Sequence, residues 1–186
     1  MNNLRRLFAL SVAYLTLADF YQNRAPGTPM KMQIREAQTS DANSITCILR
    51  ELGWFDHLSS EAVETTQQRI ASHLRLCRAD SSHSVYVAEN SAGDVVGYGA
   101  VHWMPTLFLA GPEGYVSELF VKESARGQGA GTQLLEAMAA EASKRGCSRL
   151  VVLNLRNRES YQRDFYKKCG WEERPSAVNF IRRLSS

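Results

Sequence analysis

The stretch ESARGQGAGTQLLEAM, residues 123–138, decides the fold. Residues 115–121 before it are predicted to form a strand, and the residues from about 131 onward have the apolar spacing of a helix. The first amide groups of a helix lack intrahelical partners and carry partial positive charge. Three glycines between strand and helix would let an anion approach these amides. The stretch therefore indicates either an anion site or an ordinary glycine-rich turn.

The spacing of the three glycines excludes two common phosphate-binding motifs. They stand at alternate positions behind Arg126: Gly127, Gly129 and Gly131. A P-loop requires Gly-Lys-Ser/Thr, which is missing here, and dinucleotide folds use Gly-x-Gly-x-x-Gly. The loop therefore belongs to neither class.

Helices and strands are predicted to alternate along the chain. Strands are expected at 32–37, 84–89, 95–103, 115–121, 150–155 and 178–184. Helices are expected after Thr39-Ser40-Asp41, from Ser59 or Ser60, at 131–145 and at 160–168. The nearly all-apolar segment 150–155 is typical of a strand that is buried on both faces. This order predicts an α/β or α+β fold with a mixed sheet flanked by helices.

Composition predicts one globular domain. The chain has 186 residues, of which 44% are hydrophobic and 22% charged. A net charge of +3, with scattered basic residues, argues against nucleic acid as a partner. The four cysteines lie far apart with no C-x-x-C pair, which argues against a zinc site or a disulfide framework. The four histidines are not spaced as metal ligands, so we expect no metal. The lack of a disulfide framework favours a reducing, cytoplasmic compartment.

Residues 1–30 are expected to be an accessory, non-cleaved segment that precedes a domain at 31–186. Arg5-Arg6 and a mildly apolar stretch to Ala18 resemble a signal peptide. The stretch is shorter than the about 20 apolar residues of a membrane span. The alternatives are a packed amphipathic helix, a disordered leader, an upstream start codon or contact with a membrane surface.

The segment YVSELFVKESARGQGAGTQLL, followed by LVVLNL and FYKKCGW, resembles the GNAT-type N-acetyltransferases, most specifically over residues 115–171. The resemblance implies a mostly antiparallel sheet whose strands splay apart at a cofactor slot. The family's Arg/Gln-x-x-Gly-x-Gly/Ala signature falls on Arg126, Gly129 and Gly131. In that family the loop holds the pyrophosphate of acetyl-CoA. The corresponding residues are Arg126, Gly127, Gln128, Gly129, Ala130, Gly131 and Thr132.

The resemblance also implies contacts to the pantetheine arm of the cofactor. The backbone of the strand from Glu118 through Leu119, Phe120 and Val121 would supply them. The family often has asparagine seven residues before the helix tyrosine, and here that position is Glu159. Asn154 and Asn157 lie nearby, and either is a candidate for the contact with the arm.

Glu118 is the candidate general base. On an alternating strand it would share a face with Val116 and Phe120. A carboxylate among apolar neighbours is expected to have a raised pKa, which suits a base acting directly or through water. The alternative is a glutamate at a strand edge or bulge that points into water.

Tyr166 is the candidate general acid. Tyr161, Phe165 and Cys169 recur every four residues and predict the buried stripe of their helix. Tyr166 would lie about 100° round from Phe165, off that stripe. The resemblance implies that it faces the cofactor sulfur and protonates it. The alternative is a half-buried tyrosine with a wet hydroxyl.

These features predict an acetyl-CoA-dependent N-acetyltransferase. The acetyl group would pass by direct attack to a primary amine of a small molecule or protein, and the enzyme would be a monomer or homodimer. The rival hypothesis is an acyl-CoA-binding sensor with little or no catalysis. Four aromatic residues could line the acceptor pocket or belong to the core: Trp54, Phe55, Trp103 and Phe108.

Overall fold

The computed structural model describes residues 31–184, so the expected accessory segment 1–30 lies outside the described residues. The strands are β1 (Gln33–Glu36), β2 (His83–Glu89), β3 (Val95–Met104), β4 (Glu113–Val121) and β5 (Arg149–Val152). The helices are α2 (Ala42–Leu52), α3 (Asp56–Ser60), α4 (Val63–Ala79), α5 (Ala130–Lys144), α6 (Glu159–Gln162) and α7 (Phe165–Lys168). Two short 3₁₀ turns precede α2 and α5: η1 (Thr39–Asp41) and η2 (Glu123–Ala125).

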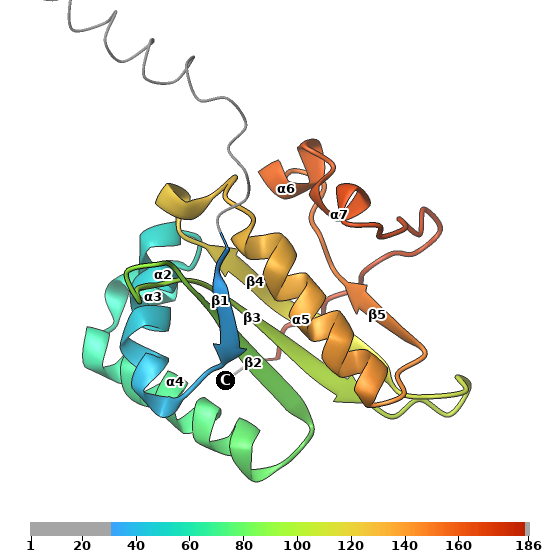
Figure 1. The fold of residues 1–186 in the computed structure, drawn as a ribbon, viewed down its shortest axis with the longest axis horizontal. Helices are drawn as coiled ribbons and strands as arrows, with labels where there is room; N and C mark the ends of the chain where they lie inside the picture. Colours follow the sequence, from blue (N-terminus) through green and yellow to red (C-terminus); the bar gives the residue numbers. More distant parts are fainter. Residues whose placement is uncertain (1–30, 185–186) are drawn as a thin grey trace, which may run out of the picture.

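The five strands form one mixed sheet in the order β1-β2-β3-β4-β5 (Figure 1). The first three pairings are antiparallel, and β4 pairs with β5 in parallel. Parallel neighbours need a crossover, which α5 provides here. The mixed, mostly antiparallel sheet flanked by helices is confirmed. Every helix within residues 31–184 is too short or too polar to cross a bilayer.

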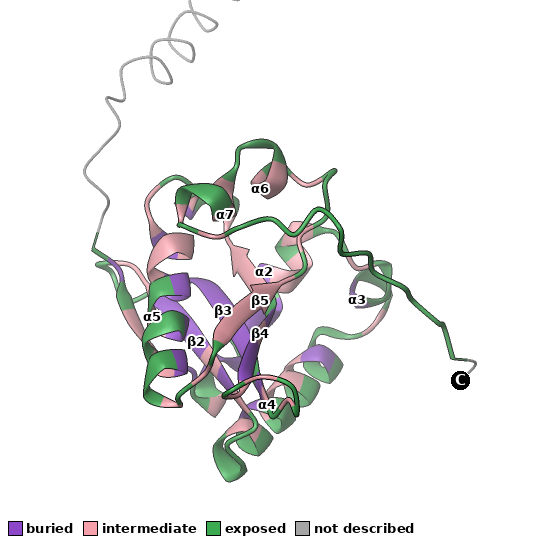
Figure 2. Cartoon of the chain, turned by 90° about the vertical axis from the view of Figure 1, so that its right-hand side faces the viewer, coloured by how far each residue is buried: buried purple, intermediate pink, exposed green. Residues whose placement is uncertain are grey.

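Each face of the sheet has its own core. Helix α5 lies on one face, where Leu134 and Met138 pack with Val101 and Val116 (Figure 2). Helices α2 and α4 cover the other face, where their core cluster includes Ile45, Ile48, Leu74, Val87 and Tyr98. The sheet between them is thus buried on both sides, which holds β3 and β4 rigidly where the site lies.

The end of the chain differs from the sequence-based expectation. The helix predicted at 160–168 is divided into α6 and α7 at Asp164, whose φ is 54°. The segment predicted as a strand at 178–184 forms none, and Phe180 is 89% exposed. Strand β5 has four half-buried residues and pairs only with β4 among the described residues. It is therefore an edge strand, and the prediction of burial on both faces was wrong.

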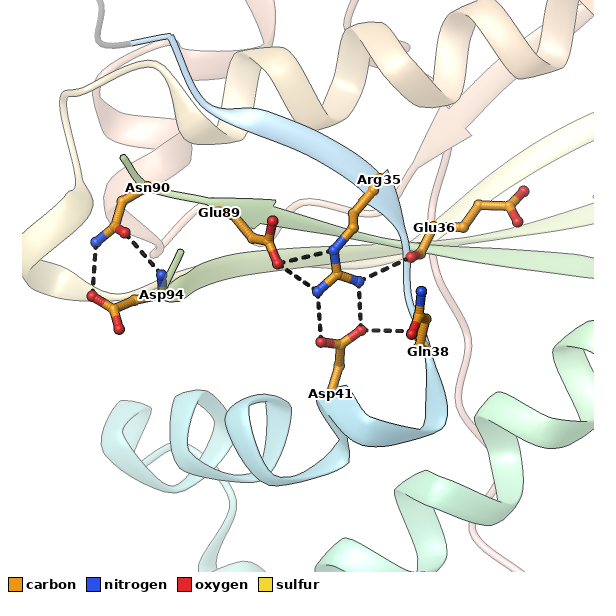
Figure 3. Close-up of polar contacts among 7 residues, drawn as sticks. All are labelled: Arg35, Glu36, Gln38, Asp41, Glu89, Asn90 and Asp94. Atoms are coloured by element: carbon orange, nitrogen blue, oxygen red, sulfur yellow. Dashed lines mark hydrogen bonds and ion pairs between the residues drawn. The ribbon is translucent and has the colours of Figure 1, made fainter. Parts of the chain in front are cut away.

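A cluster of charged groups ties β1 to β2 and to the start of α2 (Figure 3). Arg35 donates to both carboxylate oxygens of Asp41 at 2.7 and 2.8 Å, and to Glu89 Oε1 at 2.5 and 2.9 Å. The amide of Gln38 also donates to Asp41, at 2.7 Å. Burial opposes ionisation of Asp41, but these donors hold its pKa below the ordinary value.

We expect Asp41→Asn to lower the free energy of unfolding by about 2 kcal/mol at pH 7, because Arg35 loses its paired charge. A carboxyl whose pKa is depressed in the folded state stabilises the protein above its unfolded pKa of about 3.9. That contribution is lost as the pH falls through the folded-state pKa. Urea denaturation between pH 3 and 7 measures both effects.

The exposed Asp94, which accepts a hydrogen bond from Asn90 at the turn after β2, offers the matched control. Asp94→Asn should change the unfolding free energy by less than about 0.5 kcal/mol. An equal deficit of Asp41→Asn at pH 3 and pH 7 would contradict the assignment to the ion pair.

Candidate functional site

The site is built around the point where β4 and β5 separate. Their pairing runs from Glu113↔Arg149 to Val116↔Val152 and then stops. Strand β4 continues to Val121, paired only with β3 among the described residues. The backbone of the predicted residues Leu119, Phe120 and Val121 therefore has no sheet partner on the β5 side, within residues 31–184. This slot corresponds to the splayed strands that the family resemblance implied.

A bulge at Ser117 changes the face that Glu118 occupies. Opposite β3, Ala100 pairs with Glu118, and Val101 pairs with Val116, so Ser117 is an extra residue. Val116 belongs to the α5 core, whereas Phe120 packs against the α2 and α4 core. The expectation that Glu118 shares a face with both was wrong: it shares one with Phe120 only.

Glu118 accepts a hydrogen bond from a buried tyrosine. The hydroxyl of Tyr98 donates to Glu118 Oε2 at 2.5 Å, and Tyr98 is 2% exposed. Burial, and then the charge of Glu118, raises the pKa of Tyr98. The hydroxyl thus stays protonated and holds the carboxylate in a fixed orientation. Glu118 is half-buried beside this donor, which limits its freedom to turn outward.

An aromatic cluster surrounds Phe120 on the same face. Its ring lies 5.7 Å from Tyr98, 5.8 Å from Trp54 and 6.0 Å from Phe55, measured between ring centroids. Trp54 and Phe55 come from the connection between α2 and α3. The guanidinium carbon of Arg158 stands 3.8 Å from the centroid of the Trp54 ring. Within this cluster, Tyr98 contacts Glu118, and the cluster lies on the face of the sheet away from α5.

The other two aromatic candidates lie elsewhere. Trp103 is buried in the α5 core, and its indole donates to Ser84 Oγ at 3.1 Å. Phe108 is 78% exposed in the β3–β4 connection, against Arg149. Of the four, only Trp54 and Phe55 therefore belong to the aromatic cluster around Phe120.

Glycine is favoured at the three loop positions for different physical reasons. Gly127 and Gly129 have φ values of 74° and 89°, which side chains rarely tolerate. Gly129 precedes α5 and accepts the first hydrogen bond, from the amide of Gln133 at 3.0 Å. A side chain on Gly131 would start 3.1 Å from the ring of Phe165. A side chain at Gly131 would therefore require the Phe165 ring to shift.

The amide groups at this end of α5 lie close together. Those of Ala130, Gly131 and Thr132 come before the first intrahelical donor, Gln133. Gln128 donates its side-chain amide to Ser124 O at 2.9 Å, which closes the loop on itself. Together with the two positive φ values, this leaves a backbone surface that suits an anion.

Ion pairs and hydrogen bonds join the loop to the segment after β5. Arg126 pairs with Glu159 at 3.5 Å, so the residue at the family's asparagine position contacts the glycine loop. Asn154 is half-buried and accepts a hydrogen bond from Ser160 Oγ at 2.9 Å, whereas Asn157 is exposed. Of the two candidate asparagines, Asn154 is therefore the one that is partly buried and held in a fixed orientation.

Tyr166 lies on α7 and packs with the α5 core. Its ring makes edge contacts with Phe165 at 5.1 Å and Trp171 at 5.8 Å. Burial, and then the nearby Cys169 thiol, raises its pKa to about 12. Tyr161 instead donates to Glu173 at 3.0 Å, outside the core. The predicted stripe is thus confirmed at Phe165 and Cys169, which pack with the α5 core, but was wrong at Tyr161. Tyr166, expected off the stripe, packs with the core as well, because the break at Asp164 changes the direction of the chain between α6 and α7.

A cavity of about 850 Å³ extends from Tyr166 and Asn154 along β5 to the C-terminal segment. Glu118 and the glycine loop do not line it. Glu118 lies on the α2 side of β4 and Tyr166 packs with the α5 side, so the two candidates flank the slot from different sides. Within residues 31–184, no three His, Cys, Asp or Glu side chains are grouped to hold a metal.

Two residues of the site were missed by the sequence analysis, Tyr98 and Arg158. Tyr98 meets Glu118 only through the register of β3 and β4, which no local pattern reveals. Arg158 meets Trp54 across 104 positions of chain, and one arginine in a polar loop carries no distinguishing signal.

Comparisons with known proteins identify the family and the fold of the chain. The model of the acetyltransferase (GNAT) family matches residues 48–171. A thialysine N-epsilon-acetyltransferase of Bos taurus is 30% identical over 156 residues, which cover 76% of this chain and 85% of that protein. Glucosamine 6-phosphate N-acetyltransferase 1 of Oryza sativa subsp. japonica is 30% identical over 126 residues, covering 66% and 73%.

Solved structures show the same fold. The crystal structure of glucosamine-6-phosphate N-acetyltransferase from Arabidopsis thaliana superposes with a TM-score of 0.65. The match covers 83% of this chain and 99% of that one, at 18% sequence identity.

Proposed function

The chain belongs to the GNAT family of acetyltransferases and is an N-acetyltransferase, and we propose that it moves the acetyl group of acetyl-CoA directly to a primary amine of a small molecule. Family members generally use acetyl-CoA as the donor. The names of the curated relatives, which specify thialysine and glucosamine 6-phosphate, favour a small amine over a protein as acceptor.

The observation that carries the proposal is the glycine loop at the start of α5, beside the slot of β4. Gly127 and Gly129 keep the backbone open, and the amides up to Thr132 can donate to a diphosphate. The unpaired edge of β4 from Leu119 to Val121 suits the amides of a pantetheine arm. Asn154 would meet the same arm from the other side.

The reaction needs one proton removed and one supplied. The amine nitrogen forms a bond to the thioester carbonyl carbon, and the carbon–sulfur bond breaks. Glu118 takes a proton from the amine, directly or through water, and Tyr166 donates its hydroxyl proton to the departing thiolate. The raised pKa of Tyr166 keeps this proton in place at neutral pH.

The proposal is tested by measuring acetyl-CoA consumption with a panel of small amines, together with donor binding. Acetyl-CoA at a hundredfold excess over its dissociation constant should stabilise the protein by ~2.7 kcal/mol. Thr132→Glu adds a negative charge to the first turn of α5, which favours the helix but repels a diphosphate. We expect at least tenfold weaker donor binding with unchanged or increased stability.

Ala140→Glu, on the exposed side of α5, is the control for net charge and should leave donor affinity unchanged. Equal affinity in Thr132→Glu and wild type would remove the loop from the donor site. Donor binding without turnover of any amine would instead favour a sensor.

We expect Glu118→Gln to lower kcat by roughly 10²–10⁴-fold with little change in donor affinity, because the amide cannot accept the amine proton. The remaining activity should rise with pH as more acceptor becomes neutral. Ser117→Ala, at the neighbouring exposed position, should keep the wild-type rate. A near-normal rate and pH profile in Glu118→Gln would show that the carboxylate is not the base.

Tyr166→Phe keeps the ring packing and removes only the proton donor, so kcat should fall roughly 10²-fold or more with a smaller effect on KM. The decrease in kcat should be smaller with an acetyl thioester of a more acidic thiol, because that leaving group depends less on protonation. Tyr161→Phe, on the neighbouring helix, is the matched control and should keep kcat.

The stability of Tyr166→Phe should change by less than about 1 kcal/mol in a denaturation curve. Equal losses of kcat on both thioesters would count against the acid role.

A further inference from the structure

Arg158 lies over the ring of Trp54, which belongs to the aromatic cluster around Phe120. Its guanidinium carbon lies 3.8 Å from the centroid of the Trp54 ring, a distance at which the two planes are in van der Waals contact. Arg158 follows β5, and Trp54 follows α2. The pair therefore joins two connections that are more than 100 residues apart in the chain.

The charge of Arg158 is not neutralised by any carboxylate among residues 31–184. Its neighbours are paired: Arg126 with Glu159 at 3.5 Å, and Arg156 with Glu173 at 3.2 Å. Across the described residues 31–184, Arg158 has no ion pair with a carboxylate. A guanidinium that stacks by its face keeps its N–H donors available around its edge, where they match the oxygens of a carboxylate or phosphate.

The position of this cation is defined relative to the proposed base. Trp54 contacts Phe120 at 5.8 Å, and Phe120 contacts Tyr98 at 5.7 Å, whose hydroxyl donates to Glu118. A continuous row of rings thus runs from Arg158 to Glu118. A small acceptor lying along this row would have an apolar wall, a base at one end and a fixed cation at the other.

We propose that the acceptor is a small amine that carries a carboxylate or phosphate, which Arg158 binds while the amine meets Glu118. This inference rests on the proposed N-acetyltransferase function and specifies the class of its acceptor. Trp54 is the positioning residue, because its ring holds the guanidinium in place. A neutral amine of the same length would lack this contact and bind more weakly.

The test uses pairs of acceptors that differ only in the anion. One series comprises ω-amino carboxylates with three to six carbons and their carboxamides. A second series comprises aminoalkyl phosphates and the corresponding amino alcohols. For the wild-type enzyme, we expect one of the two anionic series to be preferred. The kcat/KM of its members should be about ten- to a hundredfold higher than that of their neutral analogues, mainly because KM is lower. The preferred chain length reports the span from Arg158 to Glu118, and the preferred series identifies the anion.

Arg158→Gln should reduce the ratio of kcat/KM between the anionic amine and its neutral analogue to near one, while kcat/KM for the neutral amine stays unchanged. Arg158→Lys should keep part of this ratio. Arg163→Gln is the matched control, because Arg163 also lies over a ring, that of Phe165, in the same segment. It should keep the wild-type ratio. No anionic preference in wild type, or an equal loss for both members in Arg158→Gln, would overturn the inference.

Trp54→Phe should keep most of the anionic preference and Trp54→Ala should lose it, since only the former keeps a ring under the guanidinium. Binding of the anionic amines to the CoA-saturated protein is measured in parallel by calorimetry. If wild type acetylates no amine, the proposed function fails. In that case, anion binding that Arg158→Gln abolishes still supports the subsite, and no binding rejects it.

Discussion

The separation of β4 from β5 is the constraint on which the rest of the site depends. The strands pair in parallel only as far as Val116↔Val152, and β4 then runs on to Val121 against β3 alone. Backbone groups along such an edge need a hydrogen-bonding partner other than the sheet. A ligand with its own amide groups can provide one, which is why we propose the slot as the place of the extended donor substrate.

The bulge at Ser117 decides which side of this slot receives the carboxylate. Without the extra residue, Glu118 would point to the α5 core, as Val116 does at 1% exposure. An unpaired carboxylate buried there would be strongly unfavourable. The bulge turns Glu118 toward Tyr98, which donates a hydrogen bond, and toward the rings around Phe120. One additional residue thus separates the packing function of β4 from its chemical function.

The parts of the fold that have local signals could be predicted from the sequence, and those set by pairing could not. Strands β1 to β4 and helix α5 follow from alternation, caps and glycines, and the glycine loop was found where it was expected. The bulge was invisible because alternation within β4 says nothing of the register with β3. The break at Asp164 depends on one left-handed residue, so a continuous 3.6-residue pattern hid it. Residues 178–184 have apolar residues typical of a strand, but a strand needs a neighbour, and none is formed there.

The two halves of the site differ in how firmly they are built into the fold. The donor half is packed directly: Gly131 lies against Phe165, and Thr132 contacts Cys169, so the glycine loop and the helix that carries Tyr166 are fixed to each other. The proposed acceptor half consists of Trp54 and Arg158, which stand on connections and contact each other, with Trp54 also against Phe120. Residues on connections change with little cost to the core. In the proposed enzyme, the choice of acceptor can therefore change through these two positions while the frame proposed to bind the donor stays the same.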